Sequence, residues 1–116
     1  MTLDEANHRL FIGCRSPARL LVLDTASGKT VAQIEISSDT DDVFYDAKRQ
    51  RIYVSCGEGF LDVFQWAEGD RYERIAHQPT RGGARTSFYS PDFDRLYLAV
   101  PKRFGQDAEI QIYQPQ

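Results

Sequence analysis

Apolar and polar positions alternate in the same way in three short segments of the chain. Each segment begins with arginine, and the three are Arg9-Leu10-Phe11-Ile12, Arg51-Ile52-Tyr53-Val54 and Arg95-Leu96-Tyr97-Leu98. Their first residues, at positions 9, 51 and 95, lie 42 and then 44 residues apart. Side chains alternate between the two faces of a strand, so each segment predicts a strand with one aliphatic face and one face that joins an aromatic to a small residue. Because neither face is charged, both must be covered by other sheets.

Each of these strands lies within a longer unit that has the pattern of an antiparallel meander. Gly and Asp residues, which tolerate a positive φ, separate the short apolar runs. The complete unit is predicted to have strands over residues 42–45, 51–56, 60–66 and 71–77. The flanking units contain three predicted strands each, with at most a stub of a fourth over residues 1–3. The blade units therefore span about residues 1–36, 42–77 and 85–116.

A period in the low forties with four short strands per unit is typical of propeller blades. We therefore predict an all-β fold, a partial β-propeller of four-stranded antiparallel blades with ten strands in three repeat units. Since closed propellers have about four to eight blades, residues 1–116 are expected to be a single repeat domain within a larger propeller, or a fragment that self-associates. A β-sandwich is the alternative that short strands and turns also permit.

The composition narrows the classes of partner. The chain has 116 residues, 41% of them hydrophobic, and a net charge of −3 with an isoelectric point near 5.3. This balance argues against nucleic acid and an anionic membrane as partners. No run approaches the roughly eighteen apolar residues of a membrane span, and the first residues do not have the pattern of a signal peptide. The expected partner is an unknown protein or small-molecule ligand, or a second copy bound through open blade faces.

The two cysteines, Cys14 and Cys56, occupy equivalent places in the first two repeats, where the third repeat has Val100. A position that accepts Cys, Cys and Val predicts a small apolar packing site, and so two buried thiols. Equivalent atoms of adjacent blades are expected to lie too far apart for a disulfide. A redox or metal role for the thiols is the alternative.

The repeated arginines and the two histidines are expected to have structural rather than catalytic roles. We expect the arginine that opens each repeat strand to close the preceding turn, by hydrogen bonding or by pairing with its acids. His8 and His77 lie too far apart in the pattern to form a zinc site with either cysteine. No nucleophile elbow and no HExxH motif is present, so we predict no catalytic residue and no cofactor.

Several segments resemble a known repeat family. Ile52-Tyr53-Val54-Ser55-Cys56-Gly57 resembles the motif of YVTN-type β-propeller repeats, and the strand and turn over residues 21–29 resemble the same family's pattern. Residues 83–101 are similar to the last blade of such proteins. The resemblance implies a seven-bladed parent that is periplasmic or secreted, and it implies no particular activity. Relatives of the same architecture include sugar lactonases and the haem-binding propeller of nitrite reductases.

Two loops between the predicted blades carry charges of a single sign. Asp39, Asp41 and Asp42 crowd one loop, and Arg81 and Arg85 flank two glycines in the next. Carboxylates are suited to a hard cation, and a glycine-rich loop with two guanidinium groups is suited to an anion. A solvated turn and an ordinary connecting loop are the plainer interpretations. Asp41 and Arg85 are equivalent positions one blade apart, so we expect opposite charges to face each other there, as a ligand site or as a salt bridge.

Two functions fit these observations. The favoured prediction is a non-enzymatic binding or scaffold module that holds a ligand or partner at the inter-blade loops near the central channel. The alternative is a propeller hydrolase of the lactonase type with a metal at the channel. That enzyme needs inward-facing carboxylates from several blades, and only Asp41 and Asp42 supply them here.

Overall fold

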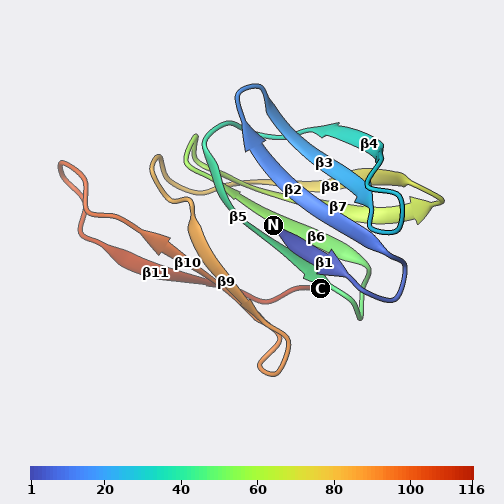
Figure 1. Ribbon diagram of the computed structural model, residues 1–116. Coiled ribbons are helices and arrows are strands. Elements are labelled where there is room, and N and C mark those ends of the chain that lie inside the picture. Colours follow the sequence, from blue (N-terminus) through green and yellow to red (C-terminus); the bar gives the residue numbers. More distant parts are fainter.

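The computed structural model describes residues 1–116 and contains eleven strands and no helix. The N-terminal sheet has the order β1 (Thr2–Asp4), β2 (Arg9–Arg15), β3 (Ala18–Asp24), β4 (Thr30–Glu35). The central sheet has the order β5 (Thr40–Asp46), β6 (Arg51–Cys56), β7 (Phe60–Glu68), β8 (Arg71–Pro79). The C-terminal sheet has the order β9 (Thr86–Ser90), β10 (Arg95–Val100), β11 (Glu109–Tyr113). Every strand pair is antiparallel, and Figure 1 shows the three sheets following one another along the chain.

The all-β fold confirms the predicted fold class, and the three meanders are consistent with partial propeller-like blades. Strand β6 begins and ends at the predicted residues, and β5, β7 and β8 extend the other three predicted strands by up to two residues at an end. The predicted count of ten strands was one too low, because the stub at the N-terminus forms β1 and pairs with β2 through Leu3 opposite Leu10. A run of three residues is too short to show the alternation that predicts a strand. No helical segment of the length and hydrophobicity needed to cross a membrane occurs.

The turn between the first and second strand of each sheet ends on a residue with left-handed backbone. The φ angles are 56° at His8, 56° at Gln50 and 53° at Asp94, each directly before the repeated arginine. Non-glycine residues adopt this conformation rarely, so its recurrence at three equivalent places shows that the turn is part of the repeat.

The repeated arginines close these turns in two sheets out of three. Arg9 donates to the carbonyl oxygen of His8 at 3.1 Å, and Arg95 donates to that of Asp94 at 3.0 Å. Arg51 instead donates to the side chain of Gln65 at 2.9 Å and to the carbonyl of the last residue. The prediction therefore holds for the first and third repeats and is wrong for the second, where the Gln65 side chain accepts from the guanidinium and itself donates to the turn carbonyls of Arg49 and Gln50.

The sheets pack through two apolar interfaces of the same design. The first interface contains fully buried side chains from the N-terminal and central sheets: Phe11, Leu20, Val22, Ile52, Val54 and Cys56. The second contains side chains from the central and C-terminal sheets: Tyr53, Leu61, Val63, Tyr89 and Leu96. In both, the aromatic face of one repeat strand meets the aliphatic face of the next. In each sheet, the aliphatic face is therefore on the side of the sheet that precedes it in sequence. The aromatic face is on the side of the sheet that follows it.

The two thiols differ in burial. Cys56 is fully buried in the first interface, and burial raises its pKa to about 12. Cys14 is only half-buried, because it lies on the face of the N-terminal sheet that no other sheet covers. Both cysteines are free. The prediction of two buried thiols is therefore confirmed for Cys56 and wrong for Cys14.

The first strands of consecutive sheets lie next to each other. Strand β5 contacts both β1 and β9. The backbone amide of Tyr45 donates to the hydroxyl of Thr2 at 3.2 Å, and the amide of Ser87 donates to the carboxylate of Asp42 at 2.8 Å. These contacts hold the three strands in series and gather the loops that precede β5 and β9.

Candidate functional site

Backbone hydrogen bonds join the loops at one edge of the three sheets. The amide of Gly57, in the turn between β6 and β7, donates to the carbonyl of Asp39 at 2.7 Å. The amide of Gly83, in the loop between β8 and β9, donates to the carbonyl of Gly57 at 2.7 Å. The turn between β6 and β7 is therefore hydrogen-bonded both to the loop before β5 and to the loop before β9. We refer to the segments 36–42, 57–59, 80–86 and 101–108 as the loop cluster.

Asp39 lies at the centre of the loop cluster. Its carboxylate is 3.1 Å from the guanidinium of Arg85 and 3.7 Å from that of Arg15. The backbone at Asp39 has a φ of 61°, and its carboxylate lies over Gly57, where any side chain would collide with it. Asp39 therefore links segments from all three sheets, and it is the partner of Arg85 that the sequence pattern assigned to Asp41.

The other two aspartates of this loop have separate partners. Asp41 lies 3.5 Å from Arg15 and accepts a hydrogen bond from the hydroxyl of Thr86 at 3.3 Å. Asp42 accepts the hydrogen bond of the Ser87 amide described above. The three carboxylates thus point to different groups. No three His, Cys, Asp or Glu side chains are placed together in a way that could hold a metal ion.

Glu58 adds a carboxylate at the rim of the loop cluster. It accepts hydrogen bonds from the backbone amide of Ser38 at 2.8 Å and from its hydroxyl at 3.0 Å. These two hydrogen bonds lower the pKa of Glu58, because both favour the charged form. Glu58 therefore contributes a fixed negative charge that ties the loop before β5 to the turn after β6.

The glycine-rich loop before β9 accommodates a guanidinium group from another loop. Arg81 does not join Arg85, because it pairs with Glu109 at 3.1 Å. Gly83 has a φ of 86°, and a Cβ atom there would lie 2.6 Å from Nη2 of Arg103. The missing side chain of Gly83 therefore leaves the space that the side chain of Arg103 fills.

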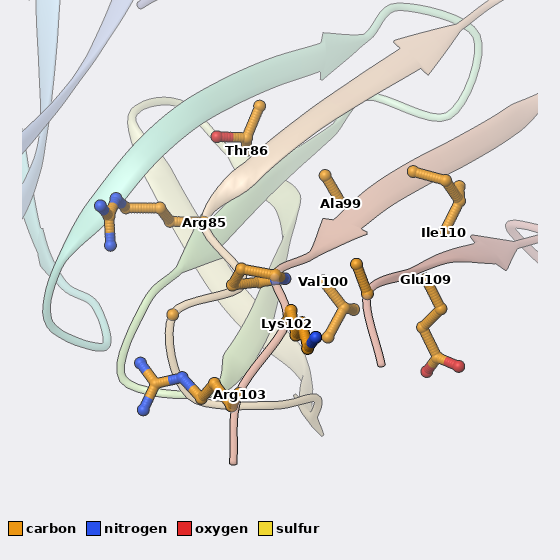
Figure 2. A pocket seen from close by; sticks show the side chains of 11 residues that line it. Arg85, Thr86, Ala99, Val100, Lys102, Arg103, Glu109 and Ile110 are labelled. Carbon is orange, nitrogen blue, oxygen red and sulfur yellow. The ribbon is translucent and has the colours of Figure 1, made fainter. Parts of the chain in front are cut away.

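A cavity of about 720 Å³ opens beside this loop. Its charged lining comes mainly from cations, namely Arg85, Lys102 and Arg103, together with Glu109. Figure 2 shows the side chains of Arg85 and Arg103 extending to the same side of the ribbon and Glu109 extending to the other side. Arg85 and Glu109 have ion-pair partners, whereas Lys102 and Arg103 form no salt bridge. We call this space the basic cavity.

The structure therefore separates the five predicted site residues. Arg85 lines the basic cavity, and Asp39 pairs with it from outside. Arg81, Asp41 and Asp42 do not line the cavity. Sequence reasoning missed Lys102 and Arg103, for which the only signal was two adjacent cations in an unusually long loop.

Sequence reasoning also missed a pair formed by a buried aspartate and an exposed histidine. Asp62 is fully buried on β7, and its carboxylate lies 2.6 Å from Nδ1 of His77 and accepts the amide of Ser37 at 2.7 Å. The imidazole stacks on Phe60, with 3.8 Å between the ring centroids. The signal was an aspartate within the apolar run of Leu61 to Phe64. Because both oxygens of Asp62 have partners from different segments, the pair ties β7, β8 and the loop before β5 together.

The comparisons with known proteins show a fold and no family. No protein-family model and no curated protein matches the sequence. Among solved structures, the chain is similar to the hydrazine synthase of Kuenenia stuttgartiensis, with a TM-score of 0.83 and 15% sequence identity. The match covers 97% of this chain and 32% of that chain, so residues 1–116 span about a third of its length. At this identity the similarity shows the fold alone.

Proposed function

We propose that the protein is a non-enzymatic binding module of the β-propeller type, with YVTN-like repeats, that holds an anionic ligand in the basic cavity. The observation that carries the proposal is the pair of cations at this cavity, Lys102 and Arg103, that form no salt bridge. A ligand that brings carboxylate or phosphate oxygens supplies the acceptors that these two side chains lack.

The size and the walls of the cavity support this function. Its volume of about 720 Å³ lies within the range of about 300–1,000 Å³ that is usual for small-molecule sites. Ala99, Val100 and Ile110 contribute apolar lining next to the charged groups. The side chain of Arg103 lies against the backbone of Gly83, which places its guanidinium beside the glycine-rich loop.

The partners of the carboxylates favour binding over metal-dependent hydrolysis. A lactonase-type site needs several acids that converge on one ion. Here Asp39 lies between two arginines, and Asp41 and Asp42 contact groups at the start of β9. These acids hold the loops in place, and so the basic cavity is the better candidate for recognition.

Calorimetric titration with small anions tests the proposal. Inorganic phosphate, pyrophosphate and citrate are the probes, since they present phosphate or carboxylate oxygens without further chemistry. We expect the wild-type chain to bind at least one of them and Arg103→Gln to bind it about tenfold more weakly, because one charged hydrogen-bond donor is lost.

Arg71→Gln is the matched control, because Arg71 lies at the start of β8 and pairs with Glu68 and Glu73, away from the cavity. This variant is expected to bind as the wild type does. If Arg103→Gln and Arg71→Gln weaken binding equally, or if none of the three probes binds, the proposed site is wrong.

A further inference from the structure

Two large sheet faces remain uncovered at the ends of the series. On the N-terminal sheet, the uncovered face is aliphatic and carries Leu3, Leu10, Ile12, Cys14 and Leu21. We call it the back face. Leu3 is exposed, and the other four are half-buried. They lack the full burial that the equivalent residues Ile52, Val54 and Cys56 have in the first interface.

The uncovered face of the C-terminal sheet has a different character. It carries Phe88, Tyr97, Ala99, Ile110 and Ile112, and we call it the front face. Phe88, Ile110 and Ile112 are 59%, 61% and 62% exposed. Large apolar side chains grouped on one sheet face at this exposure are unusual for a monomer and mark an interaction surface.

The two interfaces within the chain show what such faces bind. In the first, Phe11 and Gly13 of the N-terminal sheet face the sheet that carries Ile52 and Val54. In the second, Tyr53 of the central sheet packs against Leu96 of the next sheet. Each time, a face with an aromatic and a small residue covers an aliphatic face. The front face offers the aromatic and small pair Tyr97 and Ala99, and the back face offers the aliphatic partner.

We propose that the front face of one copy of the chain packs against the back face of a second copy. The contact repeats the packing rule of the two internal interfaces, with Tyr97 and Ala99 of one copy opposite Leu10, Ile12 and Cys14 of the other. Because the two faces differ, the contact is head-to-tail, and each copy keeps one free face unless the series closes on itself. Two copies contribute six sheets, which lies within the range of about four to eight for a closed ring.

The proposal is independent of the anion site, although the two regions adjoin. Ala99 and Ile110 border both the front face and the basic cavity. A docked copy therefore covers the open side of that cavity. Association is measured below by mass in the absence of any anion probe, so its outcome does not depend on the proposed function.

Complementary single-face variants test the head-to-tail contact. Ile12→Asp places a charge on the back face, and Ile112→Asp places one on the front face. We expect the wild type to associate with rising concentration in light scattering coupled to size exclusion, and each variant alone to remain a monomer. An equimolar mixture of the two variants is expected to form a dimer, because each still has the one intact face that the other needs.

Ile75→Asp is the control, because Ile75 is 49% exposed on β8 and belongs to neither face. It is expected to associate as the wild type does. Circular dichroism and the thermal midpoint establish that each variant is folded. A wild type that stays monomeric, a mixture of folded variants that does not associate, or loss of association in Ile75→Asp would overturn the proposal.

Discussion

Arg49 joins the central and C-terminal sheets through two carboxylates. Its guanidinium lies 2.6 Å from Asp94 across the interface and 3.0 Å from the buried Asp46 of its own sheet. Tyr53 donates to Asp46 at 2.7 Å, and Tyr89 donates to Asp94 at 3.1 Å, so both acids have a second partner. The hydrogen bonds from Arg49 lower the pKa of Asp94 to about 2.

This pKa shift predicts a stability that depends on pH. The pKa of Asp94 is lower in the folded chain than its unfolded value of about 3.9, so its contribution is complete above that value and is lost as the pH falls toward about 2. We expect the free energy of unfolding, from urea titrations, to fall over this window in the wild type and to fall less steeply in Asp94→Asn. Asparagine tolerates the left-handed backbone at this position, so the variant tests the charge.

Asp92→Asn is the control for this prediction, since Asp92 is exposed and makes no salt bridge. Its pH profile is expected to match that of the wild type. Equal slopes for Asp94→Asn and Asp92→Asn would show that the ion pair with Arg49 does not contribute.

At the scale of the elements, the second strands β2, β6 and β10 carry equivalent residues in unequal surroundings. Leu98 on β10 is fully buried and clusters with Val100 and Ala84, whereas Ile12 on β2 lies on the uncovered back face. The strands were predictable, because a period of two with no charge on either face is a strong signal. The burial of the individual side chains was not predictable, because it depends on whether a neighbouring sheet covers that face of the strand.

Truncation of these equivalent residues should therefore have unequal effects. We expect Leu98→Ala to lower the free energy of unfolding by about 3 kcal/mol, since it opens a cavity among fully packed apolar side chains. Ile12→Ala is expected to cost less than about 1 kcal/mol at a dilution where the chain is monomeric. Urea unfolding measures both. Equal losses would mean that the back face is covered within the monomer.

The loops were predictable only in part, for a physical reason. The position of the loop cluster follows from the repeat, and so does the expectation that an aspartate of the loop before β5 faces Arg85. The partner of Arg85 was assigned to Asp41 because the alignment cannot show the left-handed turn at Asp39. Lys102 and Arg103 lie in a loop with no counterpart in the other repeats, so nothing in the pattern indicated where their charges would point.

At the scale of the whole molecule, the chain is a series of sheets with two unlike ends. In both internal interfaces an aromatic face packs against an aliphatic face. The aromatic front face and the aliphatic back face, which could form a third interface of this kind, are exposed at the two ends. The C-terminal sheet also has three strands where the others have four, so the outer edge of β11 is unpaired. A strand edge of this kind is a second point at which another chain can join.

The most direct test of the contact between the front face of one copy and the back face of another measures the reactivity of the native thiols. Cys14 lies on the back face, and burial keeps Cys56 protonated with a pKa near 12, so a thiol reagent at neutral pH reports on Cys14. We expect the labelling rate of Cys14 in the wild type to fall as the protein concentration rises, and to stay constant in Ile112→Asp, whose front face is blocked. A wild-type rate that does not change with concentration would contradict the contact between front and back faces.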